Sequence, residues 1–266
     1  MRTVDGMESC RIGTVDLRYV AHGSGTPVVV LHGAGVDHRE PEACFDPILE
    51  RYAGVRRIYP DLPGMGETSA PDSMRSADDV LDVLLGLVDE VAGPSPLVVM
   101  GHSAGGYYAQ ALAARRPTHV VGLALVCPLL ATTHDVPVHR PVVAGDLGDD
   151  EFRSYFVLQT PEMLARYQRF VAPGAAIADL EAMGRIGERW ELTPAPRDSA
   201  YAGPTLLVAG RRDSTVGCAA TVELLDEYPA ATLAVLGNAG HALPHEQPEM
   251  LAALVEDWLA RCGLGR

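Results

Sequence analysis

A serine between two glycines is the strongest chemical signal in the sequence. The segment Gly101 to Gly105 reads Gly-His-Ser-Ala-Gly; it follows the apolar run Leu97 to Met100, which predicts a buried strand, and precedes a helical pattern from Tyr107 to Arg115. A tight strand-to-helix turn strains the backbone of its serine, and glycines two residues away on each side avoid crowding it. The serine also stands at a helix N-terminus, where the dipole favours developing negative charge. We therefore expect Ser103 to be a nucleophile in acyl transfer.

Five segments together resemble the α/β-hydrolase superfamily, in particular its cap-bearing serine esterase and lactonase-like branch. They are Leu31-His32-Gly33-Ala34-Gly35, Asp61-Leu62-Pro63-Gly64-Met65-Gly66, Gly101 to Gly106, Gly210-Arg211-Arg212-Asp213 and Asn238-Ala239-Gly240-His241. The resemblance implies an α/β fold in which a mostly parallel central sheet carries helices on both faces, with a helical cap inserted over the site. It is specific for the superfamily and says little about the substrate.

A histidine and an aspartate complete the expected catalytic set. His241 lies in a turn-rich loop between the last predicted strand and the last helix, from which a general base can reach Ser103 at the carboxyl edge of the sheet. Asp213 follows the preceding strand, so the chain order Ser, Asp, His is the one typical of this fold. Two alternatives stay open: His245 as the base, and Asp135 as the acid, because some relatives place the acid after the earlier strand.

The oxyanion of an acyl-transfer intermediate requires two N–H donors. The residue after the nucleophile, Ala104, supplies one, and the resemblance assigns the other to Ala34, in the loop after the strand Val28 to Leu31. We interpret His32 as a structural histidine, and the segment 61–66 as a structural turn.

Apolar runs alternating with helical patterns predict the parallel sheet. Expected strands are Val28 to Leu31, Val55 to Tyr59, Leu97 to Met100, Val120 to Val126, Thr205 to Ala209 and Thr232 to Leu236, with an N-terminal hairpin over Cys10 to Ile12 and Val15 to Val20. An apolar stripe that begins after Ser76, an expected N-cap, predicts one helix, and a second stripe after Pro248 predicts the C-terminal helix.

Residues 129–200 interrupt this alternation. They contain helical spacings of aromatic and aliphatic residues, and Thr160-Pro161 is typical of a helix start. We therefore predict a hydrolase core made of residues 1–128 and 201–266, and a helical cap made of residues 129–200.

A cap over Ser103 must present some apolar surface to the substrate. We expect Tyr155, Phe156 and Trp190 to contribute to it, although cap aromatics also form the cap's own core. The substrate class expected from such a wall is small to medium and apolar.

Composition excludes several other classes of protein. All 21 basic residues are arginine, so a lysine Schiff base, a Ser-Lys dyad and a GK[ST] phosphate loop are impossible. The net charge of −14 and the lack of a basic stripe disfavour nucleic-acid binding. Five scattered cysteines, no apolar leader and no long apolar run favour a cytoplasmic protein that does not bind a membrane. His134 and His139 lack the partners of a zinc site, and no dinucleotide motif opens a helix, so we expect no metal and no cofactor.

The sequence thus predicts a serine hydrolase that cleaves an ester or lactone of a small-molecule substrate through an acyl-enzyme on Ser103. A thioesterase, an amidase or peptidase, and an acyl-transfer or cyclising enzyme would use the same three residues. A peptidase would need a carboxylate to hold the substrate's free amine, and none is identifiable in the cap. A ligand receptor on the hydrolase scaffold is the alternative from a different class, and turnover distinguishes it from an enzyme. The oligomeric state stays open.

Overall fold

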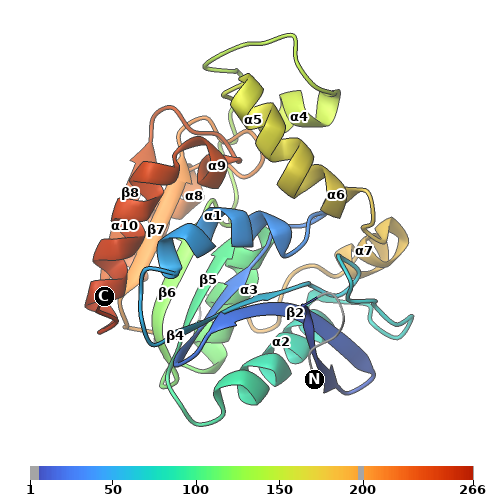
Figure 1. The fold of residues 1–266 in the computed structure, drawn as a ribbon, viewed down its shortest axis with the longest axis vertical. Helices are drawn as coiled ribbons and strands as arrows, with labels where there is room; N and C mark the ends of the chain where they lie inside the picture. The colour runs from blue at the N-terminus through green and yellow to red at the C-terminus, as the bar shows by residue number, and fades with distance from the viewer. Residues whose placement is uncertain (1–5, 197–200, 266) are drawn as a thin grey trace.

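Residues 6–196 and 201–265 are described by a computed structural model of the chain (Figure 1). One mixed sheet has the order β1-β2-β4-β3-β5-β6-β7-β8, antiparallel between β1, β2 and β4 and parallel elsewhere. Its strands are β1 Glu8–Ile12, β2 Val15–Gly23, β3 Thr26–Leu31, β4 Val55–Pro60, β5 Leu97–His102, β6 Val120–Val126, β7 Thr205–Gly210 and β8 Ala231–Leu236. Every expected strand is present, and the predicted α/β class is confirmed.

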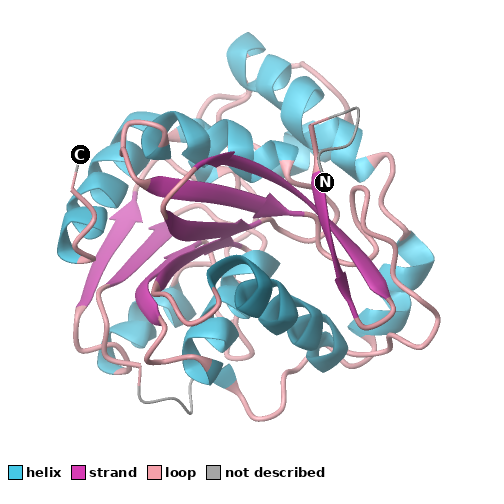
Figure 2. Cartoon of the chain, turned by 60° about the horizontal axis from the view of Figure 1, so that its bottom comes forward, coloured by secondary structure: helices cyan, strands magenta, loops and turns pink. Residues whose placement is uncertain are grey.

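Helices cover both faces of the sheet (Figure 2). The larger helices are α1 Arg39–Leu49, α2 Ala77–Ala92, α3 Ala104–Arg115 and α10 Pro248–Arg261, and the short ones after the cap are α8 Ala219–Glu223, a 3-10 turn Leu224–Asp226 and α9 Leu243–Glu246. Successive residues of β3 serve the two layers: Val29 packs with the apolar side chains of α2 and α3, and Val28 packs with those of α1 and α10. This two-sided burial explains why the central strands are continuous apolar runs rather than alternating ones.

Local sequence signals set the helix boundaries. Ser76 caps α2 by accepting a hydrogen bond from the Asp79 N–H, as its sequence position predicted. Helix α1 was not predicted, because prolines at positions 41 and 47 and an N-cap residue, His38, without a side-chain cap hide its pattern. Its apolar side chains, including Phe45 and Ile48, are nevertheless buried in the hydrophobic cluster that α1 and α10 form with one face of the sheet.

Between β6 and β7 the chain forms a run of short helices: α4 Asp150–Tyr155, α5 Pro161–Arg166, a π-helical turn Tyr167–Val171, α6 Ala172–Ala175 and α7 Leu180–Gly187. Helices α4, α5 and α6 form the top of the molecule in Figure 1. Phe152, Phe156 and Tyr167 build a small hydrophobic cluster of their own, and Val36 and Ala242 of the core join it. The last four residues of the predicted cap, 197–200, lie outside the described residues.

Candidate active site

Ser103 occupies a strained turn between β5 and α3. Its φ of 54° and ψ of −122° are rare for a residue with a side chain. Space is minimal around the turn: a Cβ on Gly101 would lie 2.1 Å from the Gly105 carbonyl oxygen, and a Cβ on Gly105 would lie 2.3 Å from that of Leu31. Glycine at both positions is therefore required by close backbone approach, and the turn keeps Ser103 Oγ above the sheet edge.

His241 meets Ser103 from the loop after β8. Its Nε2 lies 2.9 Å from Ser103 Oγ, and its Nδ1 lies 2.8 Å from Asp213 Oδ2. Because a carboxylate only accepts hydrogen bonds, Nδ1 donates to Asp213, and Nε2 of the neutral ring is free to accept the serine proton. The rival base, His245, is buried elsewhere and does not reach Ser103; its Nε2 faces Glu40 at 3.3 Å.

Asp213 is fully buried after β7. Its Oδ1 accepts the backbone N–H groups of Thr215 at 2.8 Å and Val216 at 3.0 Å, which leaves Oδ2 for His241. Burial alone would raise the pKa of this carboxyl, but His241 and the two N–H groups outweigh burial and lower it. Asp135, the rival acid, has a side chain 84% exposed and lies 3.8 Å from His134. The geometry therefore brings Asp213, not Asp135, to the histidine.

The two expected oxyanion donors lie around the same serine. Ala104 is the first residue of α3, where a backbone N–H has no acceptor within its own helix. The loop that contains Ala34 passes close to Ser103, since a Cβ on the neighbouring Gly33 would lie 3.3 Å from the serine Cβ. His32 is buried between Gly33 O, 2.7 Å from Nδ1, and the Leu62 N–H, which Nε2 accepts at 2.9 Å, as expected of a structural histidine.

Two cavities border this loop. The first, the polar cavity, has a volume of about 180 Å³ and is lined by Ser103, His241, Glu40, His102 and Tyr155 among others. The second, the apolar cavity, has a volume of about 150 Å³, and its lining includes Leu62, Val80, Tyr107, Ala104, Met183 and Trp190. Ala34 lines both cavities, so both border the loop that holds this expected oxyanion donor.

The three cap aromatics have different places. Tyr155 lines the polar cavity, where its ring lies edge-on to that of His241 at 5.8 Å, and Trp190 lines the apolar cavity beside Tyr107. The expectation for Phe156 is wrong: its side chain is fully buried between Phe152 and Tyr155 and lines neither cavity. Tyr155 thus faces the polar cavity, whereas its neighbour Phe156 belongs to the hydrophobic cluster around Phe152.

A buried glutamate in the polar cavity escaped the sequence analysis. Glu40, in the first turn of α1, accepts hydrogen bonds at Oε1 from Tyr155 Oη at 2.6 Å and from His245 Nε2 at 3.3 Å. His245 in turn accepts a hydrogen bond at Nδ1 from Arg166 Nε at 3.1 Å. This network joins the cap to the core, and its carboxylate comes from the core rather than from the cap. In the sequence, Glu40 is simply a glutamate followed by a proline, and this pair is not a motif that indicates a site.

A second buried carboxylate fixes the loop that holds His241. Glu246 accepts the backbone N–H groups of Val157 at 2.6 Å and Leu158 at 3.1 Å with one oxygen, and that of Gly240 at 2.7 Å with the other. Burial raises the pKa of this carboxyl, against the effect of the three N–H groups. One side chain therefore connects residues between α4 and α5 to the residue just before His241.

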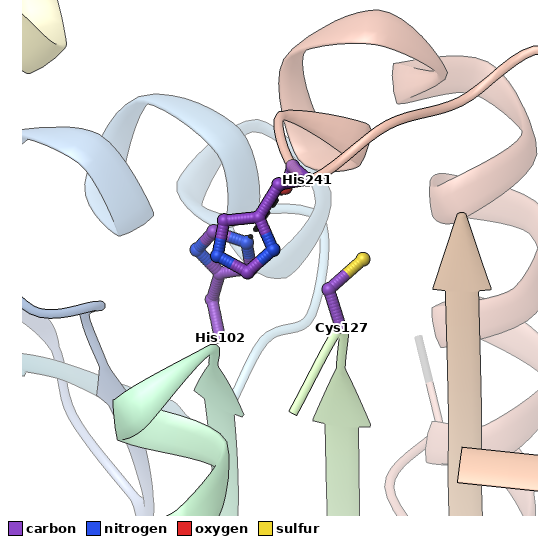
Figure 3. A group of neighbouring side chains, drawn as sticks. All are labelled: His102, Cys127 and His241. Carbon is purple, nitrogen blue, oxygen red and sulfur yellow. Dashed lines mark hydrogen bonds between the residues drawn. The ribbon is translucent and has the colours of Figure 1, made fainter. Parts of the chain in front are cut away.

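His102, Cys127 and His241 form a compact buried group with metal-ligand chemistry (Figure 3). Both ring nitrogens of His241 are already engaged by Ser103 and Asp213, and His102 Nε2 donates to the His241 carbonyl oxygen at 2.9 Å. Burial also raises the pKa of the Cys127 thiol, which disfavours the thiolate a metal requires. As arranged, His102 donates to the backbone of His241, and the Cys127 thiol donates to the carbonyl oxygen of Gly240 at 3.8 Å.

The same edge of the sheet carries the structural turn expected at residues 61–66. Asp61 is buried and accepts hydrogen bonds from the N–H and Nδ1 of His38, both at 2.8 Å, and from the Glu67 N–H at 2.9 Å. These bonds hold the residues before α1 and after β4 together.

Comparison with known proteins agrees with this architecture. The sequence profile of the alpha/beta hydrolase family matches residues 28–254. The chain belongs to that family. Like its relatives, this α/β hydrolase is an enzyme with a hydrolytic function.

The relatives are named for different substrates. A 2-hydroxymuconate semialdehyde hydrolase of Pseudomonas putida is 29% identical over 258 residues, which cover 90% of this chain and 88% of that protein. A pimeloyl-[acyl-carrier protein] methyl ester esterase of Aeromonas hydrophila is 29% identical over 263 residues, covering 89% and 96%. The crystal structure of an alpha/beta superfamily hydrolase from Oenococcus oeni is 26% identical, covers 97% of this α/β hydrolase and 100% of its own chain, and superposes with a TM-score of 0.88.

Within the described residues, every helix is too short or too polar to cross a lipid bilayer.

Proposed function

We propose that this α/β hydrolase is a serine esterase or lactonase that forms an acyl-enzyme on Ser103. The observation that carries the proposal is the hydrogen-bond chain from Ser103 Oγ through His241 to buried Asp213, at 2.9 and 2.8 Å. These are the separations at which a general base takes a serine proton and an acid orients that base. The esterase activity named for one relative supports the ester class.

In the acylation step, Ser103 Oγ forms a bond to the substrate carbonyl carbon while His241 Nε2 takes the serine proton. The N–H groups of Ala34 and Ala104 bind the oxyanion that develops. When the intermediate collapses, the bond from carbon to the leaving oxygen breaks, and His241 returns its proton to that oxygen. Asp213 stabilises the histidine while it is charged.

In the deacylation step, His241 takes a proton from water, and the hydroxide oxygen forms a bond to the acyl carbon. The bond to Ser103 Oγ then breaks, and His241 gives the proton back to the serine. No other group is required for the balance, so the proposed reaction proceeds without a metal or cofactor on a small-molecule substrate.

The apolar cavity supports acyl groups of small to medium length. Its volume of about 150 Å³ is bounded by side chains such as Val80, Met183 and Trp190, so methylene groups gain by burial until it is filled. The five cysteines are all unpaired, which supports a reducing compartment such as the cytoplasm.

A fluorophosphonate probe tests the nucleophile directly. We expect one adduct per chain, mapped to Ser103, and loss of labelling in Ser103→Ala, whose kcat on a short p-nitrophenyl ester falls by about 10⁶. Ser154→Ala, an exposed cap serine, is the matched control and keeps both labelling and turnover. Labelling that persists in Ser103→Ala contradicts the proposal. Tight ligand binding without turnover of esters, lactones or thioesters would favour a receptor.

A further inference from the structure

The polar cavity contains two hydrogen-bond acceptors with no donor between them. Glu40 Oε2 and His102 Nδ1 are 3.9 Å apart, and both residues line the cavity next to Ser103. Both side chains are more than nine-tenths buried. Among the described residues, His102 Nδ1 has no hydrogen-bond partner.

The protonation of both groups follows from their other contacts. His102 Nε2 faces a carbonyl oxygen, which only accepts, so Nε2 carries the proton. Burial lowers the pKa of His102 to about 4 despite the nearby Glu40, so the ring is neutral and Nδ1 presents a lone pair. Burial alone would raise the pKa of Glu40, but the hydrogen bond from His245 and the neighbouring His102 and Tyr155 lower it to about 2. Both donors to the carboxylate, Tyr155 and His245, bind Oε1, so Oε2 remains directed at His102.

We propose that Glu40 and His102 form a subsite that binds a hydrogen-bond donor on the leaving group of the substrate, a hydroxyl or an ammonium. Buried acceptors cost free energy when they are left without a donor, so a substrate that supplies one is favoured over an isostere that does not. The separation of the two atoms lets one ammonium donate to both of them, since each hydrogen bond spans about 2.8 Å, whereas a hydroxyl has one proton and donates to one of them.

The position of His241 identifies the part of the substrate concerned, and here the inference rests on the proposed serine mechanism. The proton that His241 returns goes to the leaving oxygen, so the leaving group must lie on the side of His241. Of the two cavities at Ala34, the polar cavity contains His241, and the apolar cavity contains Ala104 instead. The acyl chain therefore occupies the apolar cavity, and the leaving alcohol reaches Glu40 and His102.

Pairs of isosteric esters test the subsite in the unmodified enzyme. We would measure kcat/KM for 2-hydroxyethyl, 3-hydroxypropyl and 4-hydroxybutyl butyrates against n-propyl, n-butyl and n-pentyl butyrates, which match them in heavy atoms. At least one hydroxy ester should exceed its alkyl isostere by about tenfold or more. Ratios near one in all three pairs, on an enzyme that turns over the alkyl esters, overturn the subsite alone. Failure to hydrolyse any ester, with no fluorophosphonate labelling, overturns the proposed function instead.

Glu40→Gln examines the same ratio from the protein side. Its amide oxygen can still accept from Tyr155 and His245, and its NH₂ then faces His102 Nδ1 and satisfies it internally. We expect the hydroxy-to-alkyl ratio to fall toward one. Glu42→Gln is the matched control on the same helix, because Glu42 pairs with His22 outside the cavity, and it should retain the wild-type ratio. Labelling of Ser103 verifies that each variant is folded, and an unchanged ratio in labelled Glu40→Gln overturns the proposal.

Product-like inhibitors distinguish the two kinds of donor. Propane-1,3-diol, 3-amino-1-propanol and n-butanol would be compared as inhibitors of alkyl-ester hydrolysis at pH 7. Tighter inhibition by the diol or by the amino alcohol than by n-butanol supports the subsite and identifies its preferred donor. Equal inhibition by all three overturns it.

Discussion

The Nε2–H group of His102 donates a hydrogen bond of 2.9 Å to the carbonyl oxygen of His241 (Figure 3). His102, which precedes Ser103 in the chain, thus holds the backbone of His241, whose ring faces Ser103 Oγ. The two imidazole rings lie 4.9 Å apart between centroids, so they also pack against each other. Burial lowers the pKa of His102, because no carboxylate of the described residues lies within hydrogen-bond distance of its ring.

The buried His102 should make the fold sensitive to acid. Its pKa is lowered by burial from 6.5 to about 4, so the unfolded chain binds a proton in this interval that the folded chain does not. The free energy of unfolding should therefore decrease as the pH falls from 6.5 to 4, by about 3 kcal/mol from this group. Denaturant titrations of the wild type and His102→Gln across this range would measure it.

His102→Gln should have a shallower pH dependence in the same interval. Some dependence should remain, because burial also lowers the pKa of His32. Equal slopes in the two proteins would show that His102 is protonated at no cost in the folded state.

Asp213→Asn should preserve the fold and lower kcat by about 10⁴, because an amide in place of the carboxylate favours the wrong tautomer of His241. Asp135→Asn is the control. The exposed Asp135 side chain contacts neither Ser103 nor His241, so the kcat of this variant should equal that of the wild type. Initial rates on a short p-nitrophenyl ester suffice. A larger loss of kcat in Asp135→Asn than in Asp213→Asn would identify Asp135, which follows β6, as the acid.

Trp190→Ala should shift the preferred acyl chain toward greater length. In the wild type, kcat/KM should rise about fourfold with each CH₂ until the apolar cavity is full, since each buried CH₂ contributes about 0.8 kcal/mol. Removing the indole enlarges that cavity, so the maximum of an acetyl-to-palmitoyl ester series should move to longer chains.

Leu180→Ala, an exposed residue on α7 whose side chain lines neither cavity, should keep the wild-type maximum. A maximum that stays in place in Trp190→Ala would assign the acyl chain to another cavity. A rise that continues to palmitoyl in the wild type would indicate a lipase-like enzyme.

Gly101→Ala should prevent formation of the turn at Ser103. Its Cβ would lie 2.1 Å from the backbone of Gly105, and neither β5 nor α3 can move away without losing its own packing. We therefore expect the free energy of unfolding to fall by roughly 3 kcal/mol or more. Gly184→Ala on α7 is the matched control, because its Cβ meets nothing within 4 Å. It should stabilise the protein by about 0.5 to 1 kcal/mol. Thermal unfolding compares the two, and equal melting temperatures would contradict the steric argument.

The central strands β3, β5, β6 and β7 could be predicted because they are apolar runs bounded by turn residues. That Ser103, His241 and Asp213 come together could also be expected from the sequence, since a tight turn restricts the residues around Ser103 and the resemblance gives their chain order. The structure then brings Asp213 rather than Asp135 to His241, a choice that depends on distance and not on residue type.

The polar cavity could not be predicted in the same way. Glu40 lies on α1, a helix that was not predicted because its sequence contains two prolines. Its partner Tyr155 is 115 residues away in the sequence. The hydrophobic periodicity also could not show that Tyr155 lines the cavity and Phe156 does not. Helical spacing indicates which side of a helix is apolar, but not which of its residues face a cavity and which pack among themselves.

The carboxylate of Glu246 limits how the cap can move during turnover. Its three hydrogen bonds attach residues 157 and 158 to Gly240, so a displacement of that segment would also displace the backbone next to His241. Separation there would also leave a buried carboxylate with fewer donors, which is costly. The other end, around α7, is attached as well, because the Arg185 guanidinium donates hydrogen bonds to the carbonyl oxygens of Ala70, Pro71 and Met74. The predicted cap is therefore hydrogen-bonded to the core at separate places, among them the loop before His241 and the residues that precede α2.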